Sequence, residues 1–265
     1  MQNQWEAQGQ GKVAPGVYVD ARSYRPTLNW NYAVKGWLLR NEVSVLYGPS
    51  NCGKSALVCM LGHAIVSGKM FFGSRVAAGT VVHVGSEAPK SILDRMVPYK
   101  LEDAQTHLYS VRENSVDLSD PAAVAAFIAE MRALQEQEQV AITLIVFDTL
   151  ARSIGDADEN CNSTMTRVAN AAAKIARSLN SHVMLVHHTG KDVERGSRGA
   201  SALRAAVDTE ISLEGAKDSN AVSVTQVKQR AMKKSNSVQF ELVEFVLGLD
   251  EDCLTSAPMG QFRSI

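Results

Sequence analysis

A glycine-rich loop near residue 50 constrains this 265-residue chain more than any other feature of its sequence. The phosphate-loop pattern G-x-x-x-x-G-K-[ST] is matched at every specified position by Gly48-Pro49-Ser50-Asn51-Cys52-Gly53-Lys54-Ser55. A β-rich run at 42–47 precedes the loop, and a helical stretch from 54 to about 66, which Gly68 can terminate, follows it. In this strand–loop–helix context, backbone N–H groups and the helix N-terminus can surround an anion. The motif therefore predicts a site for nucleotide phosphates.

Segments with strand character alternate with helical segments along most of the chain. Strands are expected at 42–47, 80–84, 108–111, 141–147 and 182–186. Further helices are expected from Pro89 to about 99, at 121–136 with Ser119 or Asp120 as N-cap, and at 164–179. Three last runs alternate apolar and polar residues without helices between them: 208–213, 221–227 and 237–246. The pattern predicts an α/β fold, a mostly parallel sheet flanked by helices with a C-terminal antiparallel extension.

Composition and length limit the organisation of this fold. Residues 1–28 are polar and read as an N-terminal extension, whereas 29–265 are expected to form one domain. No apolar run reaches the ~18 residues that a membrane span needs, and the N-terminus lacks an apolar signal core. We therefore expect a cytoplasmic protein without membrane contact. The four cysteines have neither C-x-x-C nor zinc-finger spacing and are expected to be reduced.

Charge is distributed unevenly along the chain. The formal net charge is -1, which argues against a uniformly basic protein that coats nucleic acid. Residues 101–160 hold 12 acidic and 3 basic residues, net -9, whereas 187–234 hold 9 basic and 6 acidic residues, net +3. Nucleic-acid contacts are thus still allowed, but they are expected to be confined to a few loops.

Asp148 stands at the carboxyl end of the apolar strand 141–147. Ligands of open α/β sheets bind at that edge, next to the phosphate loop. Asp148 and the Ser55 hydroxyl are therefore expected to hold Mg²⁺, with Lys54 reaching the β- and γ-phosphates of ATP. The alternative for Asp148 is a helix-capping or loop aspartate.

Glu87 follows the strand 80–84 by three residues. A carboxylate at that strand tip can orient or deprotonate the attacking water. It can equally cap the helix that begins at Pro89, and sequence position alone leaves both roles open.

The order of four motifs gives the chain a family resemblance. GPSNCGKS, HVGSE, LIVFDTL and VMLVHHTGK together resemble the RecA-like hexameric ATPases, above all the plasmid RepA type of replicative helicase and its phage relatives. The resemblance extends from about 29 to 246. It implies a RecA-like P-loop core, ATP and Mg²⁺ as ligands, a ring of identical subunits, and Glu87 as the catalytic base.

Two histidines, His187 and His188, end the strand that begins near 182. The resemblance implies that one of them senses the γ-phosphate, and which one is left open. The alternative is a zinc ligand or a core histidine, but no cysteine or third histidine is spaced to complete a metal site.

The segment 189–201 carries Lys191, Arg195 and Arg198 among small residues. A flexible, basic, glycine-bearing loop suits contact with single-strand phosphates, and the resemblance places a DNA-facing loop here, inside a ring. The alternative is a solvated surface loop, since Asp192 and Glu194 also lie in it.

Lys228 and Arg230 lie at the end of the segment AVSVTQVKQR, residues 221–230, and alternating spacing puts them on one side of a strand. The resemblance implies a K-x-R pair that reaches the γ-phosphate of the neighbouring subunit. The alternative is an ordinary charged edge strand.

These features lead to a first functional hypothesis: a Mg²⁺-dependent, ring-forming ATPase that moves on single-stranded DNA, as a replicative helicase does. The alternative is a RecA/KaiC-like recombinase or regulatory ATPase that binds DNA or protein without unwinding.

Overall fold

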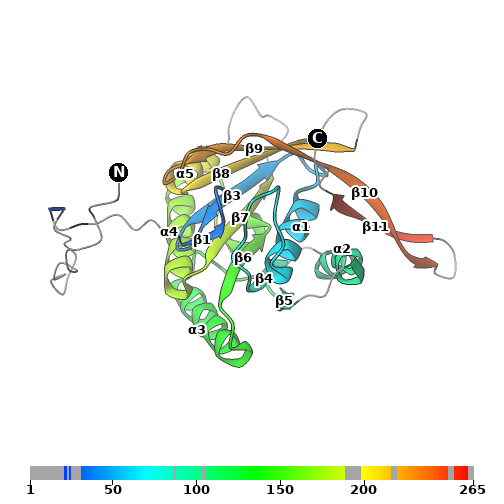
Figure 1. Ribbon diagram of the computed structural model, residues 1–265. Helices are drawn as coiled ribbons and strands as arrows, with labels where there is room; N and C mark the ends of the chain where they lie inside the picture. The colour runs from blue at the N-terminus through cyan, green and yellow to red at the C-terminus, as the bar shows by residue number, and fades with distance from the viewer. Residues whose placement is uncertain are drawn as a thin grey trace, which may run out of the picture. The chain divides into compact units, whose positions relative to one another are not determined.

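One sheet of nine strands organises the chain in the computed structural model (Figure 1). Its members are β3 (Val43–Gly48), β4 (Thr80–Gly85), β5 (Tyr109–Arg112), β6 (Ile142–Asp148), β7 (His182–His188), β8 (Thr209–Gly215), β9 (Ala221–Gln229), β10 (Val238–Leu249) and β11 (Leu254–Gln261). They follow the order β11-β10-β9-β8-β3-β7-β6-β4-β5. Neighbours from β8 to β5 pair in parallel, and neighbours from β8 to β11 pair antiparallel. The predicted mostly parallel sheet with an antiparallel C-terminal extension is confirmed.

The structure describes residues 21–22, 24, 31–85, 88–102, 106–188, 198–215, 220–249 and 254–261. The chain divides into two units, Met1–Asn31 and Tyr32–Ile265, and every helix and strand named here belongs to the second. That unit also contains a short antiparallel pair, β1 (Tyr32–Val34) and β2 (Leu38–Leu39), which the sequence pattern did not predict. The pair adds apolar side chains to the core on one face of the sheet.

Helices cover both faces of the sheet (Figure 1). α1 (Lys54–Ser67) and α2 (Pro89–Glu102) pack on one face, and α3 (Pro121–Glu138), α4 (Asn162–Leu179) and α5 (Arg198–Ala206) pack on the other. Successive residues of β6 point to opposite faces, so Val146 joins the core under α1 whereas Phe147 contacts Phe127 of α3. Burial on both faces explains why β6 is a continuous apolar run. Within the described ranges, none of the helices is long and apolar enough to span a bilayer.

Local signals set the ends of two helices. Gly68 ends α1 with a left-handed backbone, φ 68°, and its N–H donates to carbonyls of the last turn. Asp120, rather than Ser119, caps α3, because its carboxylate accepts hydrogen bonds of 2.9 and 3.3 Å from N–H groups of the first turn. Pro121 occupies the start of that helix, as predicted.

Two elements differ from the sequence prediction. The loop expected across 189–201 is too long, because α5 begins at Arg198. The α5 sequence RGASALRAA is rich in alanine and leucine, which are strong helix formers. The segment after 246 was assigned no element, yet it completes β10 and forms β11. β11 contains Pro258 and Gly260, which disfavour strands, but pairing with β10 at the edge of the sheet accommodates them.

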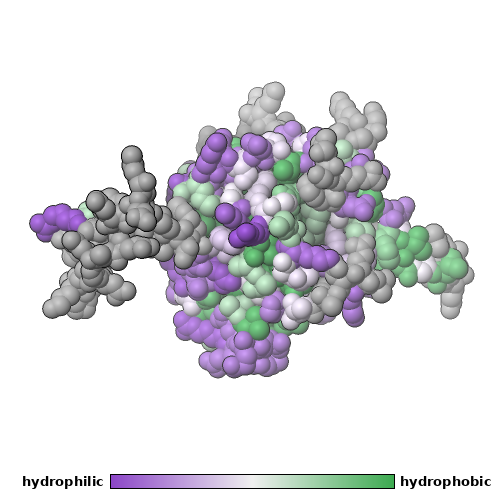
Figure 2. All heavy atoms as spheres, in the orientation of Figure 1, coloured by the Kyte–Doolittle hydropathy of each residue, from purple (hydrophilic) through white to green (hydrophobic). Residues whose placement is uncertain are grey.

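β10 and β11 form a hairpin that extends beyond the helices (Figure 1). Near its base, the Tyr99 hydroxyl of α2 donates a 2.6 Å hydrogen bond to the carbonyl of Gly260. Apolar side chains gather toward its outer end (Figure 2), where Val246 and Leu249 are 49% and 81% exposed. The base of the hairpin is therefore part of the core, and its outer end is surface.

A buried histidine of β7 contacts residues of β2 and β3. His182 has no exposed surface; its Nδ1 lies 2.7 Å from the carbonyl of Leu39 and its Nε2 lies 2.8 Å from the hydroxyl of Ser44. A neutral imidazole satisfies both contacts, donating to the carbonyl and accepting from the hydroxyl. Burial lowers the pKa of His182 from 6.5 to about 4, and the Leu39 carbonyl only partly opposes this.

The pH dependence of stability should carry the signature of His182. Because the unfolded chain takes up a proton near pH 6.5 and the folded chain only near pH 4, the stability from the neutral imidazole is complete above pH 6.5 and is lost as the pH falls toward 4. We expect the free energy of unfolding of the wild type to fall by up to about 3 kcal/mol more than that of His182→Gln over this range. Urea unfolding at several pH values measures the difference. Parallel pH profiles for the two proteins would contradict the assignment.

Candidate nucleotide-binding site

A cavity of about 440 Å³ opens where β3, β4, β6 and β7 end at one edge of the sheet. Parallel pairing aligns these ends, so Gly48 lies beside His188 and Gly85 lies beside Asp148. Ligands of open α/β sheets bind at this edge. The phosphate loop and the start of α1 line the cavity with Asn51, Gly53, Lys54 and Ser55.

The phosphate loop folds tightly around the Lys54 amine. Its Nζ donates hydrogen bonds of 2.9 and 2.7 Å to the carbonyls of Gly48 and Pro49. Gly53 has φ 92°, a backbone conformation that favours glycine, and it lies close to Leu242 of β10. Lys54 is only 4% exposed, so its ammonium group is a nearly buried cation at the position where the motif predicts phosphate.

Ser55 and Asp148 meet at the floor of the cavity. The Ser55 hydroxyl donates to Asp148 Oδ2 at 3.2 Å, and both residues line the cavity. Hydroxyl and carboxylate oxygens are ligands that suit Mg²⁺, which completes its shell with water and substrate phosphates. Within the described part of the chain, no three His, Cys, Asp or Glu side chains cluster as a metal site. The donor set therefore fits Mg²⁺ that arrives with a nucleotide rather than an all-protein cage.

The ionisation of Asp148 suits that role. Burial alone would raise its pKa, but the contact with His83, the Ser55 hydroxyl and the nearby His188 together lower the pKa below its ordinary value. The carboxylate is therefore negatively charged at neutral pH and available to a cation.

The two histidines at the end of β7 point to opposite faces of the sheet. His188 lies on the α1 side and lines the cavity with Lys54 and Asp148. His187 is absent from the described lining of the cavity, and burial lowers its pKa below the ordinary value. Of the two histidines, His188 therefore lies at the cavity, and the γ-phosphate-sensing role stays a prediction.

Glu87 lies outside the described residues. The chain on either side of it lines the cavity, through Gly85 at the end of β4 and Ala88 before α2. Its assignment as catalytic base stays a prediction.

The structure adds site residues that the sequence did not single out. Ser91 and Arg95 of α2 line the cavity, and Arg95 donates to the carbonyl and hydroxyl of Ser91. Leu242 and Pro258 bring the base of the hairpin to the same cavity. The only local signal was the four-residue spacing of Ser91 and Arg95 on a helix predicted next to Glu87.

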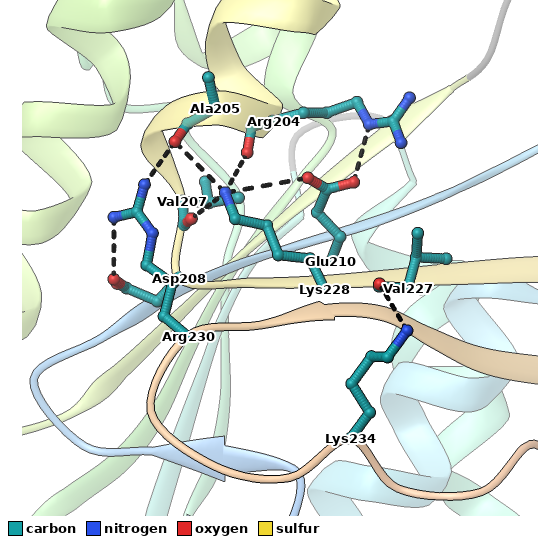
Figure 3. Close-up of polar contacts among 9 residues, drawn as sticks. All are labelled: Arg204, Ala205, Val207, Asp208, Glu210, Val227, Lys228, Arg230 and Lys234. Atoms are coloured by element: carbon teal, nitrogen blue, oxygen red, sulfur yellow. Dashed lines mark hydrogen bonds and ion pairs between the residues drawn. The ribbon is translucent and has the colours of Figure 1, made fainter.

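Lys228 and Arg230 lie on the same side of the chain, as predicted, and both contact the C-terminal end of α5 (Figure 3). The Lys228 amine donates to the carbonyls of Arg204, Ala205 and Val207 at 2.5, 3.2 and 2.7 Å. The Arg230 guanidinium donates to the Ala205 carbonyl at 2.5 Å. Cations at this end of a helix satisfy its free carbonyls and its dipole.

Carboxylates complete this cluster. Arg204 pairs with Glu210 at 2.8 Å, and Glu210 also lies 3.9 Å from Lys228. Arg230 lies 3.5 Å from Asp208, and the Arg230 side chain is 50% exposed. Within one subunit the pair therefore holds α5, and a role across a subunit interface stays a prediction.

The predicted DNA-binding residues are only partly visible. Lys191 and Arg195 lie outside the described residues, and Arg198 begins α5. DNA binding by these residues stays a prediction.

A family of AAA domains matches residues 15–194. The chain belongs to this AAA domain family. Among solved structures, a crystal structure of the RadB recombinase is similar with a TM-score of 0.51 and 13% identity over 77% of this chain and 88% of that one. No curated protein matches the chain. The AAA domain protein thus has the fold of a RecA-like P-loop ATPase, and a match to the RepA type of helicase is not among these findings.

Lys54 should dominate nucleotide affinity in this AAA domain protein. We expect Lys54→Ala to weaken binding of Mg²⁺–ATP by roughly 10- to 100-fold, because charge-assisted hydrogen bonds to phosphate contribute about 1.5–3 kcal/mol. Titration with a fluorescent ATP analogue measures the loss. Lys174→Ala, an exposed lysine of α4 outside the cavity, is the matched control and should bind as the wild type does. Equal affinity for both variants would contradict the site.

Proposed function

We propose that the protein is a Mg²⁺-dependent ATPase that assembles into a hexameric ring and couples hydrolysis to movement on single-stranded DNA, as a replicative helicase does. The observation that carries this proposal is the meeting of Lys54, Ser55, Asp148 and His188 in one cavity at the ends of parallel strands. These residues come from the motifs that give the sequence its family resemblance. The AAA domain match supports nucleotide hydrolysis.

In this proposal each residue has a separate task. Lys54 and the loop N–H groups bind the β- and γ-phosphates, and Ser55 and Asp148 hold Mg²⁺, which neutralises phosphate charge when bound. Glu87 accepts a proton from the attacking water. The water oxygen bonds to the γ-phosphorus, and the bond between the γ-phosphorus and the oxygen that bridges it to the β-phosphate breaks. His188 contacts the γ-phosphate and precedes the chain segment that holds the predicted DNA-binding residues.

A second function has support of its own. The similar solved structure is described as a recombinase, and its fold likeness favours a RecA/KaiC-like ATPase that binds DNA or protein without unwinding. Both functions share the same nucleotide site. They differ in whether hydrolysis separates strands.

Single-stranded DNA should accelerate ATP turnover in the wild type. We expect the steady-state rate to rise with added single-stranded DNA, and Glu87→Gln to keep nucleotide binding while losing roughly 10²- to 10⁴-fold in turnover. Strand displacement on a forked duplex then separates the two functions, since only the helicase releases the displaced strand. Unchanged turnover in Glu87→Gln would show that another group activates water.

Assembly is tested through Arg230. To reach the γ-phosphate of a neighbouring subunit, its half-exposed guanidinium must leave the Ala205 carbonyl and the Asp208 carboxylate. Ion pairs at the surface are weak because solvent screens them, so this step costs little. We expect Arg230→Ala alone to have little turnover and to regain it when mixed with Glu87→Gln subunits, which supply an intact arginine to an intact neighbouring site. A purely structural role at α5 predicts a loss that mixing does not restore. Full turnover by Arg230→Ala alone would also contradict the proposal.

A further inference from the structure

A buried histidine lies directly behind the carboxylate that is expected to bind Mg²⁺. His83 of β4 has no exposed surface, and its Nε2 lies 3.5 Å from Oδ2 of Asp148. Among the described residues, Nε2 has no hydrogen-bond partner, so the carboxylate is the polar group that it faces. Nδ1 lies 2.9 Å from the hydroxyl of Tyr109. One ring nitrogen is therefore held by Tyr109 and the other faces Asp148. A buried polar ring placed in this way calls for a role beyond packing.

The Asp148 carboxylate and the Tyr109 hydroxyl together favour one tautomer of the His83 ring. Burial raises the pKa of Tyr109 well above its ordinary value, so the hydroxyl keeps its proton. When it donates that proton to Nδ1, the single N–H of a neutral imidazole is on Nε2 and points at the Asp148 carboxylate. The other tautomer would direct a lone pair at a negative charge. The geometry therefore favours an Nε2–H that faces Oδ2.

Packing around Tyr109 keeps this arrangement in place. A Cβ added at Gly62 of α1 would overlap the Tyr109 ring, so glycine at this position lets the ring pass beside the helix. Tyr109 then joins the core under α1 and α2. The His83 ring is thus held by its own strand, β4, and by Tyr109, which the core packs in place.

His83 also lies beside the end of its own strand, since a Cβ added at Gly85 would lie 3.5 Å from the His83 ring. His83 and the Ser55 hydroxyl both contact Oδ2 of Asp148. Two contacts on one oxygen orient the carboxylate and present Oδ1 on its other side.

We propose that His83, fixed by Tyr109, is a positioning residue that holds the Asp148 carboxylate in the orientation in which it binds Mg²⁺ with the nucleotide. The inference rests on the proposed function, because it takes Asp148 as a Mg²⁺ ligand. His83 acts through Asp148 and does not itself contact the nucleotide. Partners of this kind commonly change metal affinity by roughly 10- to 100-fold.

The test separates metal affinity from nucleotide affinity. A fluorescent ATP analogue is titrated with the full-length protein in EDTA and at increasing Mg²⁺, and the Mg²⁺ concentration that gives half of the affinity gain is recorded. We expect His83→Leu to raise this midpoint roughly tenfold or more, while its affinity in EDTA stays within about twofold of the wild type. Tyr109→Phe should raise the midpoint by a smaller factor. His83→Gln, whose amide can still donate toward Asp148, should restore part of the loss.

A matched control accounts for the loss of a buried histidine as such. His182→Gln removes a histidine that contacts Leu39 and Ser44 on the neighbouring strands, and its Mg²⁺ midpoint should equal that of the wild type. Tyr109→Phe removes one oxygen and keeps the ring, so it decides the outcome where His83→Leu does not fold. Mg²⁺ midpoints within about twofold of the wild type for His83→Leu and Tyr109→Phe would overturn the positioning role of His83 and leave the proposed metal site standing. Where His83→Leu does not fold, the same result for Tyr109→Phe decides. A wild type that binds no tighter with Mg²⁺ than in EDTA would instead overturn the proposed metal site.

Discussion

The parallel pairing of β3, β7, β6 and β4 is the constraint on which the rest of the structure depends. It brings Gly48, His188, Asp148 and Gly85 to one edge of the sheet, although these residues lie far apart in the sequence. Helices on both faces bury the strands, and Asp148 at the end of β6 is only 9% exposed. In that setting a few donors around Asp148 suffice to keep its carboxylate ionised against the cost of burial.

The antiparallel extension adds a different interaction to this parallel core. Lys228 of β9 and Arg230 just after it reach the C-terminal end of α5, where backbone carbonyls need donors. The chain thus connects the cavity at His188 to this cationic cluster through the short segment 189–197 and α5 itself. Any displacement of α5 must change the contacts of the cluster. The pair therefore holds the end of the helix that follows this segment.

Much of the fold and part of the site could be predicted from the sequence, for physical reasons that differ from residue to residue. The phosphate loop and Asp148 were predictable because a short motif and a buried strand specify them locally. His83 and Tyr109 were not, since their roles depend on a contact between β4, β5 and β6 that no local pattern encodes. β11 was missed because Pro258 and Gly260 disfavour a strand until β10 pairs with it. Spacing placed Lys228 and Arg230 on one side correctly, but their partners on α5 came only from the tertiary structure.

The charge distribution gains a physical meaning once these contacts are known. The basic excess of 187–234 left nucleic-acid contacts allowed, and within it Arg204, Lys228 and Arg230 are neutralised locally by Glu210, Asp208 and the end of α5. Each of these cations already has a carboxylate within 4 Å in the same subunit. In the proposed function, contact with a single strand falls to the segment between β7 and α5, where Lys191 and Arg195 lie in the sequence. Nucleic-acid binding and nucleotide sensing would in that case share one stretch of chain, which begins at His188 at the edge of the cavity.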